Sequence, residues 1–243
     1  MTKQLLIYDR VKPLNADEHS EWKIKSPENY GFAQDISLAP LLCAEFLQAS
    51  LHYPIVFVAG EDDTPVPVVI LSLESDKNNY LSQDLSWNSE YIPAFIRRYP
   101  FVFTRSKDND EYYLCIDEAF EGVGLSVEGK SLFDEQKQPS EYTKGVLDFV
   151  SQYQLEHEKT RKICKLLHEF NLFDRKQLAS KTNEMQSEEV RLSGFYTIDR
   201  SRLATLRDSS LLELVKNGSY ELICNHLASL EIFKSNKFIQ PSD

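Results

Sequence analysis

Hydrophobic residues in the first half of the chain come in short runs separated by turn-forming residues. Residues 55–59 and 66–73 are apolar and rich in β-branched side chains, and Gly, Asp and Pro lie between them. This pattern predicts a β-hairpin. Residues 101–105 and 112–117 predict a second hairpin, with its turn at residues 107–110. Because short turns join antiparallel strands, we expect a mostly antiparallel sheet.

Shorter segments complete the predicted first half. Residues 3–7 and 78–81 have the composition of short strands. Residues 40–52 have apolar positions at helical spacing and begin with Pro40, which the first turn of a helix tolerates. Residues 89–98 predict a further short helix, ended by the proline at position 100.

The hydrophobic period changes in the second half. Apolar positions three and four residues apart predict one long amphipathic helix over residues 141–170. Residues 190–198 predict a strand that rejoins the sheet, and residues 208–216 and 220–233 predict two helices separated at Gly218. The sequence therefore predicts an α+β fold.

We expect the whole chain, residues 1–243, to form a single domain. Its strands are expected mainly in a β-rich, mostly antiparallel part up to about residue 133. A helical part from about residue 141 to 233 would pack with it. A composition of 42% hydrophobic and 27% charged residues suits a folded chain with a sizeable core.

The charge of the chain argues against a nucleic-acid partner. The formal net charge is −11, whereas proteins that bind nucleic acids usually present a basic face to the phosphates. The basic residues between positions 159 and 165 have Glu156 and Glu158 beside them, which indicates a solvated helix face.

Neither a signal sequence nor a membrane span is expected. The apolar run near the N-terminus is ended by Asp9 and Arg10, and a secretory signal needs about 7–15 apolar residues. The longest apolar runs, residues 55–59 and 66–71, are far shorter than the roughly 20 residues of a spanning helix. We therefore expect a cytoplasmic location, with export that needs no signal sequence left open.

Cysteine and histidine spacing gives no metal or redox motif. The four cysteines form no C-x-x-C pair, and we interpret all of them as small buried hydrophobic residues in a reducing compartment. The five histidines include no H-x-H or H-E-x-x-H pattern. We expect no metal and no cofactor, while a site assembled from distant segments stays open.

One stretch matches the P-loop pattern G-x-x-x-x-G-K-[ST]. It runs from Gly124 to Ser131, and its Lys130 would contact phosphates. The context differs from that of a P-loop, because the residues that follow do not predict a helix and Glu128 would repel phosphates. We therefore expect no nucleotide site here.

The best candidate for a ligand-binding site combines Trp87 and Tyr91 with Arg97 and Arg98. Adjacent arginines beside aromatic rings can hold a carboxylate or a phosphate through paired hydrogen bonds, so a small anionic ligand fits this segment. On a helix, neighbouring residues diverge by about 100°, so only one arginine would point into a given pocket.

A structural interpretation of the same segment is favoured over ligand binding. In that interpretation one arginine pairs with an acid such as Glu90 or Asp117, and the aromatic rings fill the core. Structural ion pairs of this kind are common in proteins.

The stretch from Trp87 to Phe101, with its I-R-R-Y-P-F segment, resembles the SapC family. Residues 53–57, 131–134, 198–203 and 225–230 add to the resemblance in the right order, so that it covers roughly residues 30 to 233. The family's name implies an association with a bacterial surface layer. Members are also encountered near genes for outer-membrane receptors and flavin-dependent halogenases, but neither association identifies a reaction.

Two functions from different classes follow. The first is a non-enzymatic, SapC-like binding or assembly protein linked to the surface layer or envelope, which contacts a protein partner or a second copy through its C-terminal helices. The alternative is a small-molecule-binding accessory protein, or an enzyme of a metabolic gene cluster, with a pocket near Arg97 and Arg98. The leucines considered for docking are Leu203, Leu206, Leu211, Leu212, Leu214 and Leu230.

Overall fold

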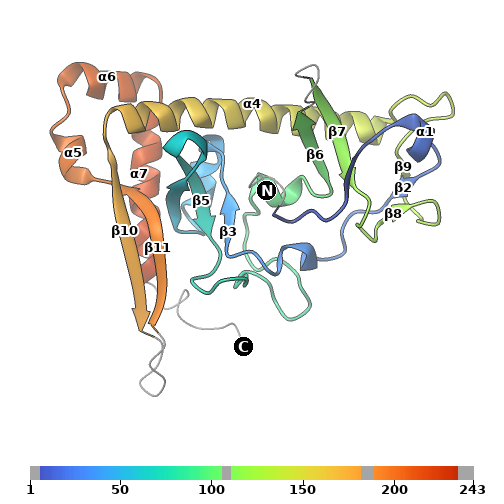
Figure 1. Ribbon diagram of the computed structural model, residues 1–243, viewed down its shortest axis with the longest axis horizontal. Helices are drawn as coiled ribbons and strands as arrows, with labels where there is room; N and C mark the ends of the chain where they lie inside the picture. Colours follow the sequence, from blue (N-terminus) through green and yellow to red (C-terminus); the bar gives the residue numbers. More distant parts are fainter. Residues whose placement is uncertain (1–5, 106–110, 182–188, 235–243) are drawn as a thin grey trace. The chain divides into compact units, whose positions relative to one another are not determined.

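The computed structural model describes residues 6–105, 111–181 and 189–234 (Figure 1). The chain forms two compact units, each made of two separate stretches. The first unit comprises Met1–Ala33 and Ile96–Leu155, and the second comprises Gln34–Phe95 and Glu156–Asp243. That the whole chain is one domain stays a prediction.

The first unit contains two small antiparallel sheets. Their strand orders are β1-β7-β6 and β8-β2-β9. The strands are β1 (Val11–Pro13), β2 (Lys23–Ile24), β6 (Phe101–Arg105), β7 (Tyr112–Asp117), β8 (Val123–Gly124) and β9 (Lys130–Ser131). A short helix, α1 (Ala16–His19), and a 3-10 turn, η2 (Gly31–Ala33), lie between β1 and β6 in the chain.

The predicted hairpin of the first unit is confirmed as β6 and β7. Phe101 pairs with Ile116 across the two strands, and both side chains are buried. Together with Leu114 they belong to a core cluster that also includes Leu132 and Val150. The predicted turn at residues 107–110 lies outside the described residues.

The long helix is also confirmed, as α4 (Glu141–Glu169). Its residues up to Leu155 belong to the first unit and those from Glu156 to the second. Val150 and Tyr153 are buried in the first part, and Cys164 and Leu167 in the second, each pair three residues apart. The three-to-four-residue spacing that predicted the helix is therefore the spacing of its buried side chains.

The second unit is built on a five-stranded antiparallel sheet with the order β10-β11-β4-β5-β3. The strands are β3 (Leu38–Pro40), β4 (Ile55–Ala59), β5 (Pro65–Ile70), β10 (Phe173–Lys181) and β11 (Glu189–Ile198). The predicted hairpin is confirmed as β4 and β5, joined by a 3-10 turn, η4 (Glu61–Asp63). The strand predicted at 190–198 does rejoin the sheet, because β11 pairs with β4. Its hairpin partner β10 was not predicted.

The helix predicted over residues 40–52 is wrong in its first part. Pro40 ends strand β3, where it pairs with Val68, and the Leu41 N–H continues the sheet by donating to the Pro67 carbonyl at 3.1 Å. Helical structure begins only at η3 (Cys43–Glu45) and α2 (Phe46–Ala49). Pairing with β5 thus overrides the local helical pattern.

Three other predicted elements of the first half differ from the structure. Residues 78–81 form no strand, and only Leu81 makes an isolated bridge, to Trp87. The helix predicted at 89–98 shortens to α3 (Ala94–Arg97). Residues 3–5 of the predicted first strand lie outside the described residues, and Leu6 and Ile7 form a turn.

The C-terminal helices belong to the second unit. They are α5 (Arg200–Ala204), α6 (Asp208–Lys216), α7 (Ser219–Ser229) and the 3-10 helix η5 (Leu230–Lys234). Gly218 separates α6 from α7 as predicted, with a φ of +80° that favours glycine. Helix α7 packs against β4, β11, α2 and α6. With strands concentrated in the first half and helices in the second, the α+β fold is confirmed.

Candidate functional site

Trp87 and Tyr91, two of the predicted site residues, lie together in the second unit. The Trp87 Nε1–H donates to the Tyr53 hydroxyl at 2.8 Å, and that hydroxyl donates to the Tyr91 carbonyl. Tyr53 is fully buried, and burial raises the pKa of its hydroxyl. The two predicted residues therefore meet through a third aromatic residue that the sequence analysis did not connect with them.

This aromatic group is anchored on the buried carboxylate of Glu45. One oxygen of Glu45 accepts hydrogen bonds from the Tyr91 hydroxyl and from the Ala94 N–H, each at 2.7 Å. The other oxygen accepts from the Leu42 N–H at 2.9 Å and caps the turn that follows. A buried carboxylate with three donors is satisfied by the fold, so these residues position the chain between α2 and α3.

Arg97 and Arg98 belong to the first unit and differ in exposure. Arg98 is 4% exposed, and its guanidinium carbon lies 4.6 Å from the Tyr153 ring centroid and 5.8 Å from that of Tyr8. Arg97 is exposed and lies 5.6 Å from the Phe149 ring centroid. The two side chains thus diverge as expected of neighbours, although α3 ends at Arg97 and Arg98 lies in the turn that follows.

Burial around Arg98 keeps its tyrosine neighbour protonated. Desolvation raises the pKa of Tyr8 far above its ordinary value, although Arg98 acts in the opposite direction. The Tyr8 hydroxyl donates to the Phe101 carbonyl at 2.8 Å. Arg98 therefore lies among packed rings, and a pocket around it stays a prediction.

Asp117, one of the acids considered as an arginine partner, serves the backbone of the first unit. Its carboxylate accepts hydrogen bonds from the N–H groups of Asp9 and Arg10, both at 2.9 Å, and of Ala119 at 3.0 Å. These bonds fix the chain that precedes β1 to the end of β7.

An ionic cluster around Glu118, which the sequence analysis missed, lies in the same unit. His19 Nε2 is 3.3 Å from Glu118 Oε1, and the cations of Lys12 and Arg10 are 3.2 and 3.3 Å from Oε2. Burial opposes ionisation of Glu118, but its contacts with Lys12 and His19 outweigh burial and lower the pKa of the carboxyl.

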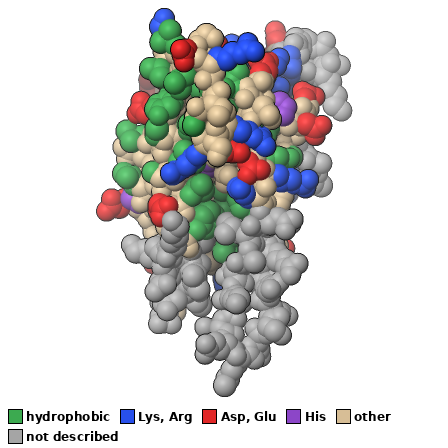
Figure 2. All heavy atoms as spheres, turned by 90° about the vertical axis from the view of Figure 1, so that its left-hand side faces the viewer, with side chains coloured by type: hydrophobic (Ala, Val, Ile, Leu, Met, Phe, Trp, Pro, Cys, Tyr) green, Lys and Arg blue, Asp and Glu red, His purple; other side chains and the backbone are tan. Residues whose placement is uncertain are grey.

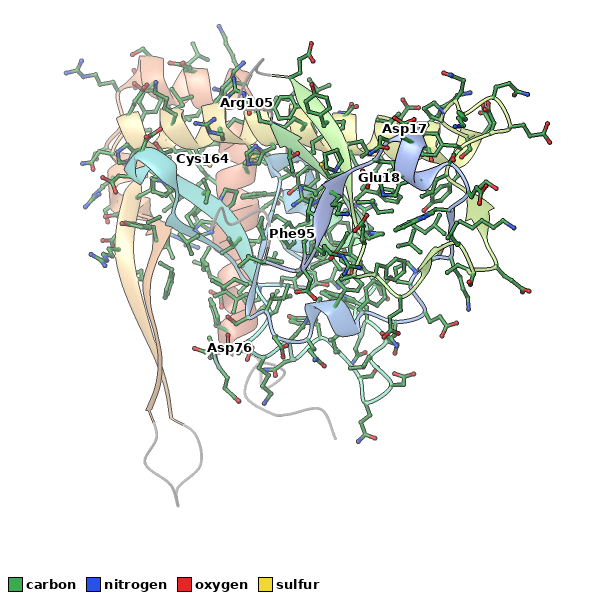
Figure 3. All side chains as sticks on the ribbon, turned by 45° about the vertical axis from the view of Figure 1, so that its right-hand side comes forward. Asp17, Glu18, Asp76, Phe95, Arg105 and Cys164 are labelled. Atoms are coloured by element: carbon green, nitrogen blue, oxygen red, sulfur yellow. The ribbon has the colours of Figure 1, made fainter. Side chains whose placement is uncertain are left out.

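Glu18, on α1 (Figure 3), completes a group of possible metal ligands with His19 and Glu118. Their ligand atoms lie within 4.8 Å of one another. However, the Lys12 ammonium is within 3.8 Å of Glu18 as well as close to Glu118, so a cation already lies between the two carboxylates. A divalent ion would have to displace it, and the arrangement serves as an ion-pair network.

The stretch that matches the P-loop pattern has a different geometry. Lys130 and Ser131 form strand β9, and Gly124 ends strand β8, both paired with β2. In a P-loop the Lys and Ser would begin a helix. Here the Lys130 ammonium lies 5.3 Å from the centroid of the Tyr142 ring, a cation–π contact.

Three of the four cysteines are buried as predicted, but the prediction is wrong for Cys224, which is exposed on α7. Cys164 of α4 (Figure 3) and Cys43 line an apolar cavity of about 10 Å³, room for one water at most. The Cys43 thiol and burial raise the pKa of Cys164, which disfavours the reactive thiolate.

Five exposed apolar side chains belong to helices of the second unit or to the residues next to them. They lie on α2, α6 and α7 or just beyond α2, and both α2 and α6 pack against α7. These residues, here called the helical apolar surface, are Leu47, Leu51, Leu212, Val215 and Tyr220. Figure 2 shows hydrophobic side chains gathered in a strip on the side of this unit that includes α6. Of the leucines considered for docking, Leu214 is buried and Leu212 is 51% exposed.

In the first unit, exposed apolar residues lie on separate elements. Leu6 is in a turn, Tyr112 and Tyr113 are on β7, Leu125 is in a loop and Leu155 is on α4. Leu212 and Val215, by contrast, share one face of α6, which gives this part of the helical apolar surface the stronger geometry for contact with another protein.

These features define an α+β protein with antiparallel sheets and exposed apolar side chains on the helices of its second unit. Among the described residues, no helix combines the length and apolar character needed to cross a bilayer. The SapC family model matches residues 14–235, and the chain belongs to that family. No curated protein and no solved structure matches the chain.

Proposed function

We propose that the chain is a non-enzymatic binding or assembly protein that associates with a second copy of itself through the helical apolar surface. The exposed side chains of Leu212 and Val215 on α6 carry this proposal. They lie three residues apart and therefore share one face of the helix. Apolar side chains on one helix face commonly form the buried core of helix–helix interfaces between proteins.

The charges of α6 favour a second copy as the partner. Asp208 and Lys216 lie four residues before and four residues after Leu212, and both are exposed. If two copies of α6 pack antiparallel about a two-fold axis at Leu212, Asp208 of each copy faces Lys216 of the other. A two-fold interface needs this kind of self-complementarity.

We propose that this assembly is linked to a surface layer or to the cell envelope, as the family resemblance implies. Family membership supports this part of the proposal by name only. Immunogold labelling of the chain in its own host tests it, and label confined to the cell interior would remove the envelope link while leaving self-association intact.

Self-association is tested by light scattering after size-exclusion chromatography over a wide range of protein concentration. We expect the fraction of dimer to increase with protein concentration, and we expect the dimer to be absent in Leu212→Lys. Leu125→Lys is the matched control, because Leu125 is 64% exposed in the first unit and outside the helical apolar surface. A monomer at every concentration, or equal effects of both variants, contradicts the proposal.

Exchange of the two charges tests the predicted register. Asp208→Lys and Lys216→Asp should each weaken the dimer, because each places like charges opposite one another. The double variant should recover it, since the charges are again complementary. Failure of the double variant to recover association, with thermal unfolding unchanged, would exclude the antiparallel arrangement of α6.

A further inference from the structure

The second unit contains an open cavity of about 470 Å³, distinct from the helical apolar surface. Its walls come from the end of α4 and from the segment that joins α5 to α6. This volume lies within the range of about 300–1,000 Å³ that is usual for small-molecule sites. Both polar and apolar residues line the cavity, so it offers directional contacts as well as a surface for carbon atoms.

Arg202 presents a fixed guanidinium group to this cavity. Its Nη1 donates to the carbonyls of Phe173 at 2.7 Å and Asn171 at 3.2 Å, and its Nε is paired with Asp199 at 3.3 Å. Within the described part of the chain, its Nη2 makes no hydrogen bond. Because the group is already held in place, its remaining N–H donors lose little freedom when they bind a ligand.

Two further donors line the same cavity. Arg207 is exposed, and neither its guanidinium nor the Ser210 hydroxyl has a hydrogen bond or ion pair with the described residues. The donors of Arg207 and Ser210 are therefore available to a ligand. Glu169 lines the cavity as well, and Asp199 already pairs with Arg202, so Arg207 is the cation of the cavity that no carboxylate of the described residues pairs with.

We propose that this cavity binds the phosphate group of a small phosphomonoester. The guanidinium of Arg207, the remaining Nη2 donors of Arg202 and the Ser210 hydroxyl can donate to the acceptor oxygens of a phosphate dianion, to which arginine can donate paired hydrogen bonds. Glu169 can accept a hydrogen bond from a hydroxyl or ammonium group of the same ligand, and Leu206 provides an apolar contact. The site differs from the predicted segment at Arg97 and Arg98 but takes the same class of anionic ligand.

Isothermal titration calorimetry of the full chain at physiological salt tests this proposal, with glycerol 3-phosphate, inorganic phosphate and glycerol as probes. We expect saturable one-to-one binding of glycerol 3-phosphate and no binding of glycerol. Tighter binding of glycerol 3-phosphate than of inorganic phosphate supports an organic ligand, and equal binding supports recognition of the phosphate group alone. The absence of saturable binding for both phosphates overturns the proposal.

The variant Arg207→Gln should weaken phosphate binding about tenfold or more, the effect of losing one charge-assisted contact. Arg161→Gln is the matched control, because Arg161 is exposed on α4 of the same unit and does not line the cavity. Equal weakening by both variants would show nonspecific attraction and overturn the site. Neither substitution changes the residues that test self-association, so the two proposals can fail independently.

Discussion

The two units of the chain bury polar side chains in chemically different surroundings. In the second unit, His226 is fully buried and neutral, and its Nδ1–H donates to the Ile55 carbonyl at 2.8 Å while its Nε2 accepts from the Ile198 N–H at 3.1 Å. In the first unit, Arg98 is a buried cation among aromatic rings, and Glu118 is held by cations. His226 therefore contributes in its uncharged form, whereas Arg98 and Glu118 contribute in their charged forms.

We therefore expect acid and salt to change the stability of the two units separately. Burial lowers the pKa of His226 to about 4 from an ordinary value of 6.5, even though the Ile55 carbonyl favours the protonated form. In the first unit, the ionised form of Glu118 stabilises the fold. Its contribution to the free energy of unfolding is therefore present above the ordinary pKa of 4.5 and is lost at lower pH. Salt screens exposed ion pairs but has little effect on a buried neutral imidazole.

The chain offers a way to observe each unit alone. It has only two tryptophans, Trp22 in the first unit and Trp87 in the second. With Trp22→Phe, fluorescence reports the second unit through Trp87, and with Trp87→Phe it reports the first through Trp22. Urea unfolding of these two single-tryptophan chains compares the stabilities of the units directly.

The largest effect is expected for His226→Ala. The substitution leaves the Ile55 carbonyl and the Ile198 N–H without their partner in a buried site and creates a cavity, so it should cost about 3–5 kcal/mol of unfolding free energy in the second unit. His168→Ala is the control, because His168 is exposed on α4. Equal losses in the two variants would show that the bonds of His226 contribute nothing measurable.

The next effect is a loss of stability of the second unit as pH falls from 6.5 to 4. In this window the unfolded chain takes up a proton on His226 while the folded chain does not, so lower pH favours unfolding. The shift corresponds to a loss on the order of 3 kcal/mol. Trp87 fluorescence should show this dependence in the Trp22→Phe chain and a much flatter one when His226→Gln is added. If the pH dependence were unchanged in the chain that carries both Trp22→Phe and His226→Gln, the titration would belong to another group.

The sequence predicts elements that depend on interactions between residues close together in the chain, and it fails where distant residues decide the structure. Continuous β-branched runs and a long three-to-four-residue period are local, so β4, β5, β6, β7 and α4 could be predicted. Pro40 misleads because its pairing with Val68 depends on a strand formed later in the chain. The predicted burial of Cys224 is wrong because helix α7 packs against the sheet with the face that carries Ile223 and His226, and Cys224 lies on another face.

The candidate sites depend even more on distant residues. Glu118 and His19 are 99 positions apart, and no spacing rule connects them. The cavity that contains Arg202 and Arg207 likewise needs the end of α4 to form its other wall. By contrast, the divergence of the neighbouring side chains of Arg97 and Arg98 was expected from local geometry, but the sequence did not indicate which of the two is buried.

A smaller effect is expected for Arg98→Ala in the first unit. The substitution removes the buried guanidinium and its contacts with the rings of Tyr8 and Tyr153, which should cost about 2 kcal/mol. Arg97→Ala should change stability by about 0.5 kcal/mol or less, because Arg97 is exposed. The Trp87→Phe chain, unfolded in urea, measures both through Trp22. Similar costs for the two arginines would contradict the assignment of Arg98 to the core.

The smallest effect is expected for Glu118→Gln, which removes the charge that Lys12, Arg10 and His19 share. Because Lys12 and Arg10 are largely exposed, the loss should be about 1 kcal/mol or less at low salt. It should shrink further as salt is added, since screening already weakens these pairs in the unsubstituted chain. Glu121→Gln removes an equal charge from an exposed residue nearby and should change neither the stability nor its salt dependence. If the two variants respond alike to salt, net charge rather than the Glu118 cluster stabilises the first unit, and the contrast between the ionic cluster of Glu118 and the neutral site of His226 fails.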